Sequence, residues 1–98
     1  MLVALERFDL RIPACRSLKE KRHVVKTLTN AIRTKFPVSV AEVDHHDLWQ
    51  RTALAVAAVG AEQHHLRRVM HEVEKVVDRW LEVEVIDRRL EILWPDDD

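Results

Sequence analysis

The chain has 98 residues, of which 47% are hydrophobic and 34% are charged, and its net charge is −1. This length accommodates one domain with one core, and the composition is that of a soluble globular protein. No stretch approaches the ~20 apolar residues of a membrane span, and the first residues lack the charged start of a signal peptide, so we expect a cytoplasmic protein.

Residues 2–12 are predicted to form the first strand, in which apolar residues alternate with charged ones from Arg7 onward. The first five residues of the chain are apolar, so the start of this strand is apolar on both faces, which indicates a central strand. Pro13 ends the strand because it cannot donate to the ladder. Glu6 falls on the parity that points into the core, so either it is paired there or the strand changes phase.

Residues 17–36 are predicted to form a helix, because Ser17 and Glu20 have the spacing of a capping box. An apolar stripe at helical spacing contains Leu18, Val25, Leu28, Ile32 and Phe36. A neighbouring cationic stripe contains Lys19, Arg22, Lys26 and Arg33. One helix is therefore expected both to anchor the core and to display a row of cations.

Residues 38–43 and 49–59 are predicted to form two strands joined by a short polar connection without Gly, which indicates a hairpin. The second of these strands is apolar on both faces after Arg51 and is also expected to be central. Gly60 ends it, and a helix follows over about residues 61–80, with Leu66, Val69, Met70, Val73, Val77 and Trp80 facing inward.

A last strand is expected over residues 83–93, with Ile86, Leu90 and Ile92 on one side. The element order is then βαββαβ. Two right-handed crossovers joined by a hairpin give an α+β ferredoxin-like sandwich, in which a four-stranded antiparallel sheet carries both helices on one face. We expect residues 1–95 to form this single domain and residues 96–98 to form an acidic tail.

Two segments, SLKEKR at residues 17–22 and SVAEVDHHDLWQR at residues 39–51, resemble the signatures of the YlxP-like family of small bacterial proteins. The resemblance covers nearly the whole chain and implies a ferredoxin-like fold. The family has no assigned function, but its genes often neighbour those for transcription elongation, translation initiation and ribosome-binding factors. The resemblance therefore implies a role near RNA or the ribosome.

Basic residues are concentrated in the first third of the chain: residues 1–36 hold nine Lys or Arg and three Asp or Glu, and residues 37–98 hold seven and fourteen. The cationic stripe is a candidate for contact with RNA phosphates. The residues predicted to make this contact are Arg16, Lys19, Arg22, Lys26 and Arg33, and Lys21 or Lys35 could extend the set. The alternative is an ordinary solvated helix face. Stacking of bases on the central strands is disfavoured, because the third strand offers alanines and Phe8 is expected to face the helices.

The sheet face away from the helices is expected to be apolar over half its area and charged over the rest. Small and apolar residues left in water favour self-association, so we expect a homo-oligomer. The residues predicted for this contact are Val3, Leu5, Ala53, Ala55 and Ala57. A homo-oligomeric structural or protein-interaction module without nucleic-acid binding is thus the alternative to an RNA-associated protein.

The polar connection after the second strand, with the first residues of the next strand, is a third candidate, for contact with a partner rather than a metal ion, because consecutive turn residues rarely converge on one ion. The alternative is an ordinary turn, in which Asp side chains bond their own backbone. Its residues are Asp44, His45, Asp47, Trp49 and Arg51. Cys15, the only cysteine, excludes an internal disulfide and a thiolate cluster, and is expected to be structural. A single Gly excludes the glycine-rich nucleotide loops, so we expect neither an enzyme nor a cofactor. Eleven Arg against five Lys is a bias that indicates a thermophile.

Overall fold

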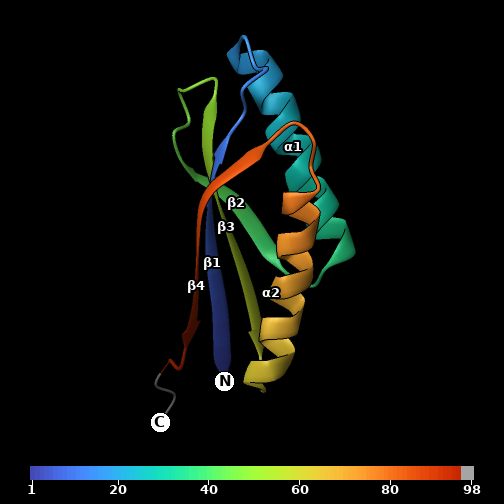
Figure 1. Cartoon of the computed structure of the whole chain (residues 1–98). Helices are drawn as coiled ribbons and strands as arrows, with labels where there is room; N and C mark the ends of the chain where they lie inside the picture. The colour runs from blue at the N-terminus through green and yellow to red at the C-terminus, as the bar shows by residue number, and fades with distance from the viewer. Residues whose placement is uncertain (96–98) are drawn as a thin grey trace.

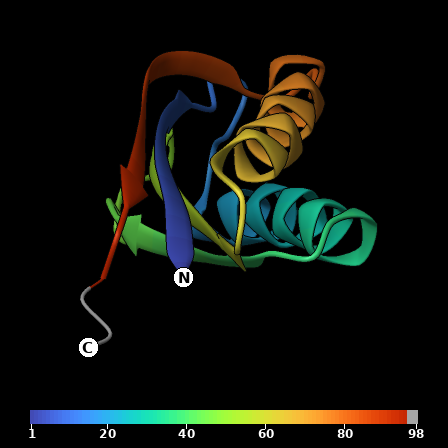
Figure 2. The ribbon, with the colours of Figure 1, turned by 90° about the horizontal axis from the view of Figure 1, so that it is seen from below.

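The computed structural model describes residues 1–95 and contains one sheet and two helices. The elements are β1 (Leu2–Arg11), α1 (Leu18–Lys35), β2 (Ser39–Asp44), β3 (Arg51–Gly60), α2 (Gln63–Asp78) and β4 (Glu84–Leu93). The strands pair antiparallel in the order β2-β3-β1-β4, and both helices cover the same face of the sheet (Figures 1 and 2). The predicted α+β ferredoxin-like fold is confirmed. The predicted acidic tail, residues 96–98, lies outside the described residues.

The core lies between the central strands and the two helices. Phe8, Leu10, Leu54 and Met70 are fully buried there, and each such side chain contributes roughly 1.5–3 kcal/mol by leaving water. Phe8 faces the helices, as predicted. Neither helix in the described part of the chain is long and apolar enough to cross a membrane.

The start of α1 is capped by Ser17 as predicted, but the Glu20 carboxylate binds the amide of Arg16 rather than the Ser17 amide that a capping box would use. The Ser17 hydroxyl accepts a hydrogen bond from the Glu20 amide at 3.1 Å, and the Glu20 carboxylate accepts one from the Arg16 amide at 3.1 Å. The core side of α1 differs from the predicted stripe, since Val24 and not Leu18 belongs to the core cluster together with Leu28 and Ile32.

The prediction for Ile86 is wrong, because β4 contains a β-bulge. Asp9 pairs with Asp87 but the next residue, Leu10, pairs with Val85, so Ile86 is an extra residue in the ladder. Its side chain is exposed, and Val85 packs against the core in its place. A bulge reverses the side-chain alternation on one side of itself, which a strict two-residue period cannot anticipate.

Strand β1 does not change phase at Glu6, whose side chain is buried in the core and only 1% exposed. Burial, together with a hydrogen bond and charge repulsion from Glu74 on α2, raises the pKa of Glu6 to about 8. The Asp78 carboxylate acts in the same direction, and the Arg88 guanidinium on β4 opposes it. The raised pKa favours the protonated, uncharged form of Glu6 at neutral pH.

We predict that this carboxyl pair makes folding pH-dependent. Unfolding lowers the pKa of Glu6 from about 8 to its ordinary value of 4.5, so the folded state holds a proton that the unfolded state releases between these two values. The contribution of this proton to the free energy of unfolding is fully present below pH 4.5 and is lost as the pH rises to about 8. The loss is about 1 kcal/mol per pH unit. Chemical denaturation at several pH values measures it.

Glu6→Gln removes this titration while keeping the size of the side chain. As the pH rises from 4.5 to about 8, the free energy of unfolding of the wild type should therefore fall relative to that of the variant. Glu91→Gln, on an exposed position of β4, is the matched control and should change little. Parallel stability curves for wild type and Glu6→Gln would contradict a proton on Glu6.

Candidate functional site

A groove of about 360 Å³ runs between α1 and the β2–β3 hairpin. One wall comes from the exposed side of α1, and the other from β2 and the connection that follows it. The polar residues that line it are Lys21, Arg22, Lys26, Thr29, Asn30, Arg33, Glu42, His46 and Asp47.

The two walls are joined by Lys21, which is only 1% exposed. Its ammonium lies 2.9 Å from the Glu42 carboxylate and also donates to the backbone carbonyl of His45. The same Glu42 oxygen accepts a hydrogen bond from the Thr52 hydroxyl at 2.6 Å. Losing one partner of a buried ion pair typically costs about 3–5 kcal/mol, because the other charge is left uncompensated. Lys21 therefore fixes the hairpin against α1.

The prediction that Lys21 could extend the exposed cations is wrong. Lys21 lies three residues before Val24 and so falls in register with the buried face of α1, which includes Leu28 and Ile32. Glu42 lies two residues after the buried Val40 and points to the same side of β2. Helical and strand periodicity together could have revealed this pair.

The hairpin connection is also fixed at its other end. The Gln50 side-chain amide donates to the carbonyls of Pro13 and Cys15 at 3.3 and 3.1 Å, and the Ile12 amide donates to the Gln50 carbonyl at 2.9 Å. His45 has a φ of 61°, a left-handed conformation that is uncommon for a residue other than Gly. Residues 45–50 are thereby anchored on both sides, beside the start of α1 (Figure 1).

The predicted cations, four on α1 and Arg16 just before it, are all exposed, but they divide between surfaces. Within residues 1–95, the side chains of Arg16, Lys19, Arg22 and Lys26 form no ion pair or hydrogen bond. Arg33 donates to the Asn30 side chain at 2.9 Å and to the Val40 carbonyl at 3.0 Å. The structure brings Arg22, Lys26 and Arg33 together on the groove. The other proposed extension, Lys35, lies over the ring of Phe36.

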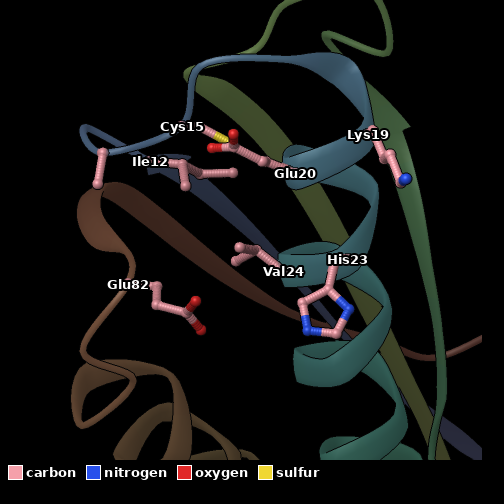
Figure 3. Close-up of a pocket in the computed structure, with 8 residues that line it drawn as sticks. Ile12, Cys15, Lys19, Glu20, His23, Val24 and Glu82 are labelled. Carbon is pink, nitrogen blue, oxygen red and sulfur yellow. The ribbon is translucent and has the colours of Figure 1, made fainter.

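Lys19 borders a different cavity, of about 400 Å³, between the start of α1, the segment before it and the connection from α2 to β4 (Figure 3). Ile12, Cys15 and Val24 form its apolar lining, and Glu82 lies across from the helix. Burial raises the pKa of the Cys15 thiol, so the thiol stays protonated. Cys15 belongs to the core cluster, which agrees with its predicted structural role.

The predicted cluster around Asp44 is not one site. Asp44 accepts hydrogen bonds from its neighbour's amide at 2.7 Å and from Arg7 at 3.2 Å, and these two donors lower its pKa. The His45 side chain points toward Asp9 on the open face of the sheet, and its Nε2 lies 3.8 Å from Oδ1 of Asp9. Asp47 instead lines the groove. The structure shows no group of three His, Cys, Asp or Glu side chains within residues 1–95 that could hold a metal ion.

The remaining two residues of that cluster, Trp49 and Arg51, line a shallow hollow of about 460 Å³ with Leu48 and Gln50. The residues of this hollow directly follow those of the groove in the chain: His46 and Asp47 line the groove, and Leu48 is the first residue that lines the hollow. The hairpin connection therefore presents a charged groove on one segment and an aromatic surface on the next.

The open face of the sheet carries Val3, Leu5, Ala55 and Ala57, as predicted. Ala53 does not belong with them, because it is fully buried. It pairs with Asp9 on one side and Asp44 on the other, and Arg7 binds both of these carboxylates across it. Two residues absent from the prediction extend the apolar surface: Leu93, which is opposite Val3, and Val59, which is 68% exposed.

Comparison with known proteins identifies the family. Residues 3–90 match the family described as "Protein of unknown function (DUF503)". The uncharacterized protein YlxP of Bacillus subtilis (strain 168) is 37% identical over 68 residues, which cover 69% of this chain and 74% of that protein.

Two solved structures share the fold at low sequence identity. The de novo designed protein Foldit4 aligns with a TM-score of 0.54 and 9% identity, over 98% of this chain and 100% of its own. Rv0793 from Mycobacterium tuberculosis aligns with a TM-score of 0.53 and 14% identity, over 100% and 98%. These likenesses concern the fold alone. The match over residues 3–90 and the identity to YlxP show that the chain belongs to the DUF503 family, as the resemblance in its sequence implied.

Proposed function

We propose that this protein is a non-enzymatic accessory protein of the cytoplasm that binds RNA, free or in the ribosome, by holding phosphates along α1. The observation that carries the proposal is the groove, in which Arg22 and Lys26 present charged groups with no partner within the described residues. Phosphate oxygens are the acceptors such groups bind in nucleic acids.

Most acidic groups near Arg22 and Lys26 are paired elsewhere and do not neutralise their positive charges. Glu42 lies in the groove but is already paired with Lys21. Glu20 is engaged at the cap of α1, and Glu72 pairs with Lys75 on α2 at 2.9 Å. Asp47 is the remaining acid of the groove. Against it stand three arginine or lysine side chains of α1, so a polyanion is favoured there.

The length of the cationic stripe suits a nucleic-acid strand better than a small anion. From Arg22 to Arg33, the cations that share the groove, the helix rises about 16 Å. Three phosphates neutralised by this stripe would release counterions and give a logarithmic salt dependence with a slope of about −2 for a single strand.

We predict that reversing Arg22 and Lys26 to Glu weakens RNA binding for every sequence and flattens the salt dependence by roughly one to two units, because contacts with phosphates do not read bases. Folding should be unchanged, because both side chains are exposed. Fluorescence anisotropy over a series of salt concentrations measures both effects.

The matched control for this reversal is Arg67→Glu with Arg68→Glu, which makes the same change of charge on the exposed side of α2. This control should bind RNA nearly as the wild type does after allowance for net charge. Equal losses in the two double variants would show that only net charge matters, and the groove would then have no role.

A second candidate function, self-association as a protein-interaction module, rests on a different surface. Val3, Leu5, Ala57, Val59 and Leu93 form a continuous apolar area on the open sheet face, where no described element covers them (Figure 2). A second copy packed on this face would remove the area from water.

We predict that the wild type is a dimer or larger oligomer in light scattering and that Leu5→Glu shifts it toward monomer, because a carboxylate would be buried in the contact. Leu81→Glu is the control, since Leu81 is 100% exposed on the connection between α2 and β4, away from the sheet face. A monomeric wild type at high micromolar concentration would rule out this candidate.

A further inference from the structure

We propose that Trp49 is a stacking platform for an unpaired RNA base, so that the RNA bound by this protein is single-stranded next to the groove. The inference rests on the proposed binding of phosphates by α1, and it adds the class of RNA and a second contact. Neither the charge of α1 nor the family resemblance specifies them.

The side chain of Trp49 is 51% exposed, although tryptophan is the largest apolar side chain. It lines the hollow with Leu48, Gln50 and Arg51. The Nε of Arg51 is buried and has no acceptor within the described residues. A flat aromatic surface beside apolar and amide groups suits a nucleobase. Any of the bases can stack on such a surface, because each has a π-face.

The hollow is close enough to the groove for one RNA strand to use both. Asp47 lines the groove and Trp49 lines the hollow, and a two-residue separation limits the distance between their Cα atoms to about 7 Å. A phosphate held by Arg22 or Lys26 and a base stacked on Trp49 can therefore belong to nearby nucleotides of the same strand.

The platform is held in place before RNA arrives. The Lys21 ammonium binds the His45 carbonyl before Trp49, and Gln50 binds two carbonyls of the segment that precedes α1. The Leu48 amide also donates to the His45 carbonyl at 3.1 Å. Because these contacts anchor the backbone on both sides of Trp49, little backbone conformational entropy is lost on binding, and more of the stacking energy is retained as affinity.

Within residues 1–95, the sheet offers no competing platform of the kind used by many RNA-binding domains with this topology. Phe8 is buried beneath the helices, and β3 presents alanines on the open face. In a duplex, the bases are already stacked on one another and are not available to a protein side chain. Trp49 is thus expected to distinguish single-stranded from double-stranded RNA.

The test compares Trp49→Ala with the wild type for two probes: a short fluorescein-labelled single-stranded RNA of mixed sequence, and the blunt duplex it forms with its complement. We expect Trp49→Ala to weaken binding of the single strand about tenfold, because base–aromatic stacking has this magnitude. Binding of the duplex should be unchanged. Trp49→Phe should retain most of the affinity, because an aromatic ring remains.

Trp94→Ala is the matched control, since Trp94 is 63% exposed but follows β4 at the opposite end of the sheet. It should bind both probes as the wild type does. If Trp49→Ala binds the single strand normally, or loses affinity for both probes equally, the stacking role is overturned while phosphate binding by α1 stands. If the wild type binds neither probe at low salt, the proposed function itself fails, and the stacking role fails with it.

Discussion

The candidate site depends on one buried charge, the ammonium of Lys21. It joins α1 to the β2–β3 hairpin through Glu42 and the His45 carbonyl, and it thereby sets the width of the groove. A buried ion pair often contributes little net stability compared with apolar residues of the same size, but it tolerates only one geometry. Lys21 therefore acts chiefly by fixing where Arg22 and Lys26 lie relative to the hairpin.

The second buried ionisable group, Glu6, lies beneath α2 and is chemically different, because it keeps its proton. We expect its titration to change the stability of the fold. The two candidate surfaces are also separate, since the apolar area containing Val59 and Leu93 lies at the end of the sheet where β1 begins and the hairpin connection lies at the other end (Figure 1). Self-association through the open face would leave the groove and Trp49 accessible.

The sequence was sufficient to predict the features that depend on local periodicity and capping. These include the order of the elements, the cap at Ser17, the central position of β1 and β3, and the exposure of the α1 cations. Several features that depend on the register of strands far apart in the chain could not be predicted. The bulge at Ile86 needs the register of β1, and the burial of Ala53 needs the Arg7 bridge to Asp44. The contact of Arg33 with Val40 likewise appears only once β2 lies beside α1.

We propose that RNA binds where α1 meets the hairpin. Nuclear magnetic resonance during titration with single-stranded RNA tests it most directly, because every amide and each tryptophan indole reports separately. We expect the largest shift changes at Arg22, Lys26, His46 and the indole of Trp49, with Trp94 unaffected. Shift changes concentrated at Ala55 and Ala57 on the open sheet face, or none at all, would contradict the claim.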